Sequence, residues 1–76
     1  MRPEADIAWD AGDMGCGELV VKLKLKLRDE AQPGFVIRLT ATDPGAPHDI
    51  PAWCRLTHNT LLFHEHPDYF IQAKGE

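Results

Sequence analysis

The stretch MGCGELVVKLKLKLRDE, from Met14 to Glu30, decides the fold because its pattern fits both a strand and a helix. Apolar and basic residues alternate from Val21 to Arg28, as in a strand with one apolar and one basic face. As a helix, the same stretch forms an apolar arc of about 100°, made of Leu19, Val20, Leu23 and Leu27. Glu18 in a first turn, the helix-forming Leu and Lys, and Pro33-Gly34 after the run favour the helix. The pattern alone leaves both structures open.

Composition limits the architecture and the class of function. A chain of 76 residues supports one core, so residues 1–76 are expected to form a single domain. A formal charge of −4 argues against a general nucleic-acid binder, which needs a net basic surface. No apolar run approaches the roughly 18 residues that cross a bilayer, and the start lacks the apolar stretch of a signal peptide. These features predict a cytoplasmic protein.

Four further segments have the pattern of strands. ADIAWDA, from Ala5 to Ala11, alternates in polarity, and FVIRLTATD, from Phe35 to Asp43, is rich in β-branched and aromatic residues. Near the end, TLLFHEH (60–66) and DYFIQAK (68–74) predict a hairpin that turns through His66-Pro67-Asp68.

The stretch DPGAPHDIPAWCRLT, from Asp43 to Thr57, predicts a helix. Asp43 can cap its first N–H groups, Pro44 suits a first turn, and Pro51 is expected to confine the regular part to the residues after it. If Met14 to Glu30 is a strand, the domain has five strands and one helix. If it is a helix, the order β-α-β-α-β-β gives a two-layer α/β sandwich (α+β), with two helices packed on one face of a four-stranded mixed sheet.

The chain resembles the TusA/SirA-like sulfurtransferases, a family of small sulfur-carrier proteins. The family pattern of an Asp-Pro pair followed by Asp-Ile/Leu-Pro at a helix entry is matched by Asp43, Pro44, Asp49, Ile50 and Pro51. Upstream, Asp10, Met14 and Cys16 also stand at family positions. The resemblance covers roughly Asp6 to Lys74 and implies that Leu19 to Arg28 is helical. It departs from the family at the cysteine, where Cys-Gly-Glu-Leu replaces the usual Cys-Pro-x-Pro.

The resemblance implies that Cys16 is the catalytic residue, which accepts persulfide sulfur and relays it to an acceptor protein. A helix N-terminus has unpaired N–H groups that favour an anion, so we expect the pKa of Cys16 to be lowered and to lie below that of Cys54. Gly15 and Gly17 leave the sulfur accessible, while the Glu18 carboxylate opposes the thiolate if it faces it. Cys54 falls on an apolar helical stripe and is expected to be a core residue.

Two other clusters have functional and structural interpretations. His64 and His66, with Asp68 or His58, have the ligand types of a zinc or nickel site, but a solvated strand end is the simpler interpretation and no metal or cofactor is expected. The basic residues form a solvated helix face or a docking surface for an acidic partner; on a helix they split into Lys22 with Lys26 and Lys24 with Arg28.

The expected function is therefore that of a monomeric sulfur carrier. Its partners would be a donor, such as a cysteine desulfurase or rhodanese-like protein, and a sulfur-acceptor protein. The alternative is a non-catalytic partner-binding domain of the same fold whose cysteine motif has drifted. Direct binding to membranes or general binding to nucleic acid is not expected.

Overall fold

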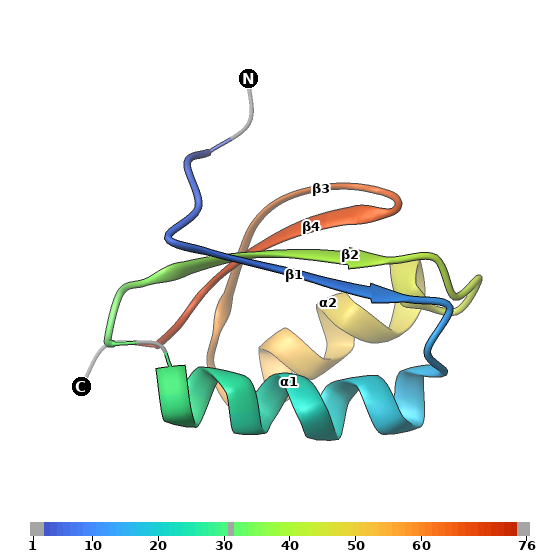
Figure 1. Cartoon of the computed structure of the whole chain (residues 1–76), viewed down its shortest axis with the longest axis horizontal. Coiled ribbons are helices and arrows are strands. Elements are labelled where there is room, and N and C mark those ends of the chain that lie inside the picture. Colours follow the sequence, from blue (N-terminus) through green and yellow to red (C-terminus); the bar gives the residue numbers. More distant parts are fainter. Residues whose placement is uncertain (1–2, 31, 75–76) are drawn as a thin grey trace.

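The chain folds into two layers, a four-stranded sheet with two helices on one face (Figure 1). The computed structural model describes residues 3–30 and 32–74. The elements, in chain order, are β1 (Ile7–Gly12), α1 (Cys16–Glu30), β2 (Val36–Ala41), α2 (Ala46–Thr57), β3 (Thr60–Glu65) and β4 (Asp68–Gln72). The predicted fold class and order of elements are confirmed.

The sheet has the order β1-β2-β4-β3 and is mixed. Strand β1 runs parallel to β2, whereas β4 is antiparallel to both β2 and β3. Because β1 and β2 are parallel, their carboxyl ends lie at the same edge of the sheet. Each of these strands leads through a short loop into a helix, so the first turns of α1 and α2 also lie at that edge (Figure 1).

Helix α1 settles the ambiguous stretch in favour of the helical pattern. Leu19 and Leu23 are 0% exposed, whereas Leu25 is 41% exposed, although a strand would place Leu23 and Leu25 on one face. The spacing of the buried pair is one helical turn. Cys16 opens the helix, as the resemblance implied, and the helix ends at Glu30, two residues beyond the expected Arg28.

Helix α2 differs from the sequence expectation at its start. Pro44 lies before the helix, and Pro51 lies inside it rather than limiting it. The N–H groups of His48 and Asp49 already bond to the Gly45 carbonyl, at 3.1 and 2.8 Å, so the first turn forms upstream of Pro51. Burial of one stripe of α2 against the core stabilises this turn despite the lost hydrogen bond; the stripe is Ala46, Ile50 and Cys54. Neither helix of the described chain is long and apolar enough to span a membrane.

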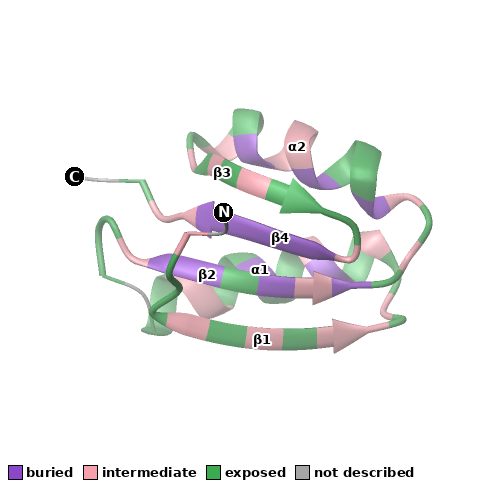
Figure 2. Cartoon of the chain, turned by 90° about the horizontal axis from the view of Figure 1, so that it is seen from above, coloured by how far each residue is buried: buried purple, intermediate pink, exposed green. Residues whose placement is uncertain are grey.

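The core lies between the helices and the sheet. Alternate residues of the strands face it, and β4, between β2 and β3, is buried over most of its length (Figure 2). The completely buried large side chains are Leu19, Leu23, Ile37, Leu39, Ile50, Tyr69 and Ile71. Cys54, at 2% exposed, belongs to this cluster, which confirms that it is a core residue. Strands β3 and β4 pair through the predicted turn at His66-Pro67.

Candidate sulfur-transfer site

Cys16 is the first residue of α1 and lies where the loop from β1 enters the helix. Gly12 closes β1 at a bulge with a φ of +60°, a conformation that glycine adopts without strain. Its carbonyl accepts hydrogen bonds from the backbone N–H and the hydroxyl of Thr42, both at 2.9 Å. The loop that leads to Cys16 is thereby fastened to the loop that follows β2.

This arrangement brings Asp43 onto the cysteine from 27 positions away in the sequence. The Cys16 thiol donates a hydrogen bond to Asp43 Oδ2 with an Sγ–Oδ2 distance of 3.0 Å. The same oxygen accepts the backbone N–H of Gly45 at 3.0 Å, directly before α2. Asp43 therefore joins the starts of the two helices through one carboxylate.

A second carboxylate, from Asp49, lies beside the first. A Cβ atom built on Gly45 would stand 3.0 Å from Asp43 Oδ2, 3.1 Å from Asp49 Oδ2 and 3.9 Å from Cys16 Sγ. Gly45 has a φ of −82°, so the requirement here is for space and not for an unusual backbone angle. Gly45 lets both aspartates approach the sulfur.

The electrostatics of the site are opposite to the sequence expectation. The pKa of Cys16 is raised to about 12, first by burial, then by the hydrogen bond and negative charge of Asp43, and then by Asp49. Burial raises the pKa of Cys54 to about 11. The expected lowering of the Cys16 pKa, and its position below that of Cys54, are therefore wrong. Burial and two nearby carboxylates together outweigh the helix N-terminus.

The other residues expected to support the thiolate, Gly15, Gly17 and Glu18, lie just before and within the first turn of α1. The Gly15 carbonyl accepts the Leu19 N–H at 2.9 Å and starts the hydrogen bonding of α1. Gly17 is exposed, and a Cβ there would meet no atom within 4 Å. The Glu18 carboxylate pairs with Lys22 at 3.9 Å and is not among the groups that shift the pKa of Cys16.

The basic residues of α1 lie on two different sides of the helix, as helical spacing predicts. Lys26 pairs with Glu30 at 2.9 Å and also lies 5.9 Å from the centre of the Trp9 ring. Lys24 and Arg28 lie instead along the side that faces α2. Whether any of the four docks a partner stays a prediction.

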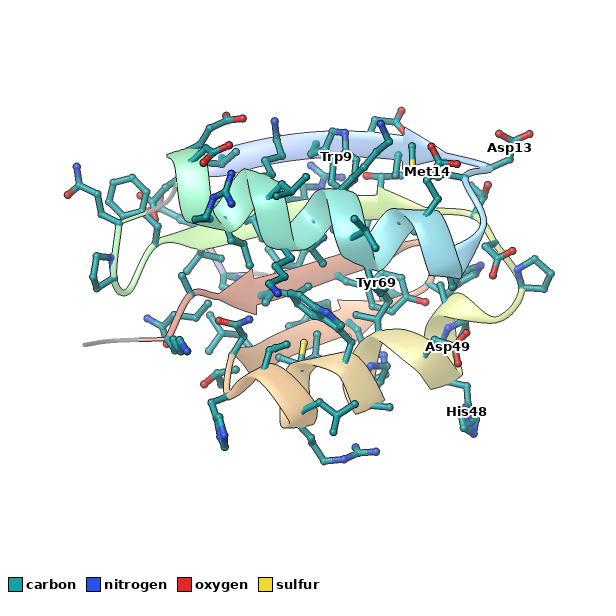
Figure 3. All side chains as sticks on the ribbon, turned by 90° about the horizontal axis from the view of Figure 1, so that it is seen from below. Trp9, Asp13, Met14, His48, Asp49 and Tyr69 are labelled. Atoms are coloured by element: carbon teal, nitrogen blue, oxygen red, sulfur yellow. The ribbon has the colours of Figure 1, made fainter. Side chains whose placement is uncertain are left out.

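The Tyr69 side chain lies close enough to Cys16 for the two groups to interact electrostatically. Tyr69 is completely buried, and its hydroxyl lies 2.7 Å from His66 Nδ1. Its pKa is raised by burial and then by the negative charge of the Cys16 thiolate. Figure 3, which views the helical face, shows Tyr69 between α1 and α2, with Asp49 on α2.

His64 and His66 both pack against Tyr69. The His64 ring stacks on Tyr69 with centroids 5.9 Å apart, and the His66 ring meets it edge-on at the same distance. Asp68 accepts hydrogen bonds from Thr40 and Arg38 at 3.0 and 3.3 Å. Within residues 3–30 and 32–74, no three His, Cys, Asp or Glu side chains converge on a position that could hold a metal.

A shallow hollow opens beside the thiol. It has a volume of about 240 Å³ and is lined by Cys16, Gly17, Val20, Asp49, Trp53 and Leu56. The half-buried sulfur is thus reachable from a surface that is largely apolar, whereas the sulfur of Cys54 lies in the core.

Comparison with known proteins identifies the family. Residues 7–73 match the family described as "Sulfurtransferase TusA". The chain belongs to the TusA family. It is 41% identical over 80 aligned residues to the sulfur carrier protein TusA of Pseudomonas aeruginosa strain LESB58, covering 100% of both chains. It is 37% identical to the TusA of Pseudomonas fluorescens strain SBW25 over 68 residues, or 90% of this chain and 75% of the relative.

A more distant TusA relative is the putative sulfur carrier protein YrkF of Bacillus subtilis strain 168. It is 31% identical over 77 residues, which cover 96% of this chain and 41% of YrkF. Sequence reasoning found the two aspartates of the TusA-like motif but assigned them only to a helix entry. The spacing between motif and cysteine could not show that Asp43 and Asp49 approach the sulfur.

The departure from Cys-Pro-x-Pro gives a stability prediction at Gly17. Gly17 lies in the first turn of α1, where a backbone N–H has no helical partner, and its φ is not positive. Gly17→Pro should therefore raise the free energy of unfolding by about 0.4–1 kcal/mol, because proline restricts the unfolded chain. Urea denaturation measures this change.

The matched control for this substitution is Gly34→Ala. Gly34 has a φ of +88°, so alanine there should destabilise the fold by about 1 kcal/mol. A loss of stability in Gly17→Pro would contradict a regular first turn at the cysteine.

Proposed function

We propose that this chain is a sulfur carrier that accepts a sulfur atom on Cys16 from a donor persulfide and passes it to an acceptor. Membership of the TusA family carries the proposal. Two observations support Cys16 as the carrier: its thiol borders an open hollow, and the other cysteine is 2% exposed.

The transfer is an exchange between sulfur atoms without net oxidation. The sulfur of Cys16 attacks the outer sulfur of a donor persulfide, R–S–SH, and a new S–S bond forms while the donor S–S bond breaks. The donor leaves as a thiolate and takes the proton that Cys16 loses. The products are Cys16–S–SH and R–SH, and the reverse exchange with an acceptor thiol restores Cys16.

The partners follow from this chemistry. A sulfur-carrier family requires sulfur-transfer partners, and we expect a donor of the cysteine desulfurase or rhodanese-like class and a protein acceptor in the cytoplasm. In the structure the thiol is held protonated by Asp43, so deprotonation must accompany docking or attack.

That protonated thiol also favours the alternative, a partner-binding domain that carries no sulfur. A thiol with a pKa of about 12 is a weak nucleophile at neutral pH. The two functions differ in whether Cys16 becomes a persulfide.

The test is intact-protein mass spectrometry after incubation with a cysteine desulfurase and L-cysteine. We expect adducts that are multiples of one sulfur atom, located on the Cys16 peptide and removed by a reductant. Cys54→Ser should keep these adducts and Cys16→Ser should lose them. Adducts that persist in Cys16→Ser, or their absence from the unmodified protein with an active donor, would refute the carrier function.

A further inference from the structure

The hollow beside Cys16 continues into a larger one between α1 and α2. The second hollow has a volume of about 510 Å³ and shares Trp53 and Leu56 with the first. We call the two together the α1–α2 groove. Leu56 lines both hollows and is 80% exposed, so its side chain offers apolar contact area to a ligand.

The two ends of the α1–α2 groove have opposite charge. Asp49 lies at the Cys16 end. Three basic residues, Lys24, Arg28 and Lys74, line the larger hollow. Within the described residues, neither the Lys24 nor the Lys74 side chain has an ion pair, whereas Arg28 pairs with its neighbour Asp29 at 2.9 Å. The far end therefore offers positive charge to a ligand.

We propose that the α1–α2 groove binds an extended segment of a sulfur-transfer partner that carries a cysteine, then an apolar residue, then acidic residues. This inference rests on the proposed function for the identity of the partner. The partner's cysteine lies at Cys16, its apolar side chain contacts Trp53 and Leu56, and its carboxylates meet the basic end.

Electrostatics determine the direction of the segment. In the opposite direction, the partner's carboxylates would lie at the Cys16 end beside Asp49 and Asp43, where like charges repel. The rise of 1.5 Å per helical residue places Lys24 about 12 Å and Arg28 about 18 Å along α1 from Cys16. An extended chain at about 3.3 Å per residue covers these lengths in roughly four to six residues.

The proposed complex also fixes the chemical step. With sulfur on Cys16, the partner thiolate attacks the outer sulfur, the Cys16 S–S bond breaks, and the partner gains the persulfide. Cys16 leaves as a thiolate and takes the proton that the partner thiol has lost. Atoms and electrons are conserved without an added oxidant or reductant.

Binding is tested with a labelled peptide, acetyl-Cys-Gly-Leu-Gly-Glu-Glu-amide, by fluorescence anisotropy at low salt. The protein is the Cys16→Ser variant, so binding is measured apart from sulfur transfer. Lys24→Glu in this background should weaken binding at least about fivefold, because it reverses a charge in the groove. Lys22→Glu makes the same change on the other flank of α1 and should leave the Kd within about twofold.

Two further comparisons test the apolar centre and the direction. Leu56→Ala should weaken binding about threefold or more, since its exposed side chain provides contact area without supporting the core. The peptide with the reversed sequence should bind more weakly than the original. Equal effects of Lys22→Glu and Lys24→Glu, equal binding of both peptides, or no binding at all would overturn the inference. If Cys16 forms a persulfide but the peptide does not bind, the carrier function stands and the groove inference fails. If the peptide binds but Cys16 forms no persulfide, the groove inference stands and the carrier function fails.

Discussion

Replacing Asp43 with asparagine is expected to make Cys16 between about threefold and thirtyfold more reactive toward iodoacetamide at neutral pH. The carboxylate of Asp43 accepts a hydrogen bond from the Cys16 thiol, with an Sγ–Oδ2 distance of 3.0 Å, and its negative charge opposes formation of the thiolate. Removing one neighbouring charge commonly changes a pKa by one to three units. Each unit increases the thiolate about tenfold but lowers its nucleophilicity about threefold, which leaves about threefold per unit.

Asparagine at position 43 removes the negative charge but keeps a hydrogen-bond acceptor of the same shape. Its carbonyl oxygen can still accept the Gly45 N–H, so the start of α2 keeps its hydrogen bond. Its amide N–H₂ can donate to the Cys16 thiolate, which favours the anion further. The pH dependence of alkylation should therefore shift to lower pH while the free energy of unfolding changes little.

The control for this experiment is Asp13→Asn. Asp13 precedes Cys16 by three residues but points away from the molecule, so its replacement should leave the alkylation rate unchanged (Figure 3). Asp49→Asn should give an increase smaller than that of Asp43→Asn, since Asp49 raises the pKa of Cys16 less. A slower reaction in Asp43→Asn would show that Asp43 acts chiefly as the acceptor of the thiol proton during attack.

The second large effect is expected in the core. Leu23→Ala should lower the free energy of unfolding by about 2–5 kcal/mol, because it removes a completely buried side chain and leaves a cavity. Urea denaturation followed by tryptophan fluorescence measures the loss.

Leu25→Ala is the matched control on the same helix. Leu25 is 41% exposed, so its truncation should change stability by no more than about 0.5 kcal/mol. The alternating pattern of the sequence would place both leucines on one buried face. Similar losses in the two variants would contradict the helix and support that face.

Much of the fold could be predicted from residues near one another in the chain. The β-branched run of β2 and the turn at His66-Pro67 express local preferences and formed where expected, whereas α2 formed as expected but begins upstream of Pro51. For the stretch Cys16–Glu30 the local signal was divided, because Leu and Lys in alternation satisfy a strand while their propensities favour a helix. The position of Cys16 ahead of this stretch was also found from sequence, through the resemblance to a sulfur-carrier family.

The sequence by itself therefore determined the order of the elements, with the helical state of Cys16–Glu30 following only from the family resemblance, and it predicted Cys16 as the sulfur carrier. Only the tertiary structure decided the chemical state of that thiol. Parallel pairing of β1 with β2 places their carboxyl ends together, and this brings Asp43 across 27 positions to within 3.0 Å of Cys16. A pKa depends on charges in space, and no spacing along the chain indicates which carboxylate arrives there. The same packing of α1 beside α2 created the groove that leads away from the sulfur.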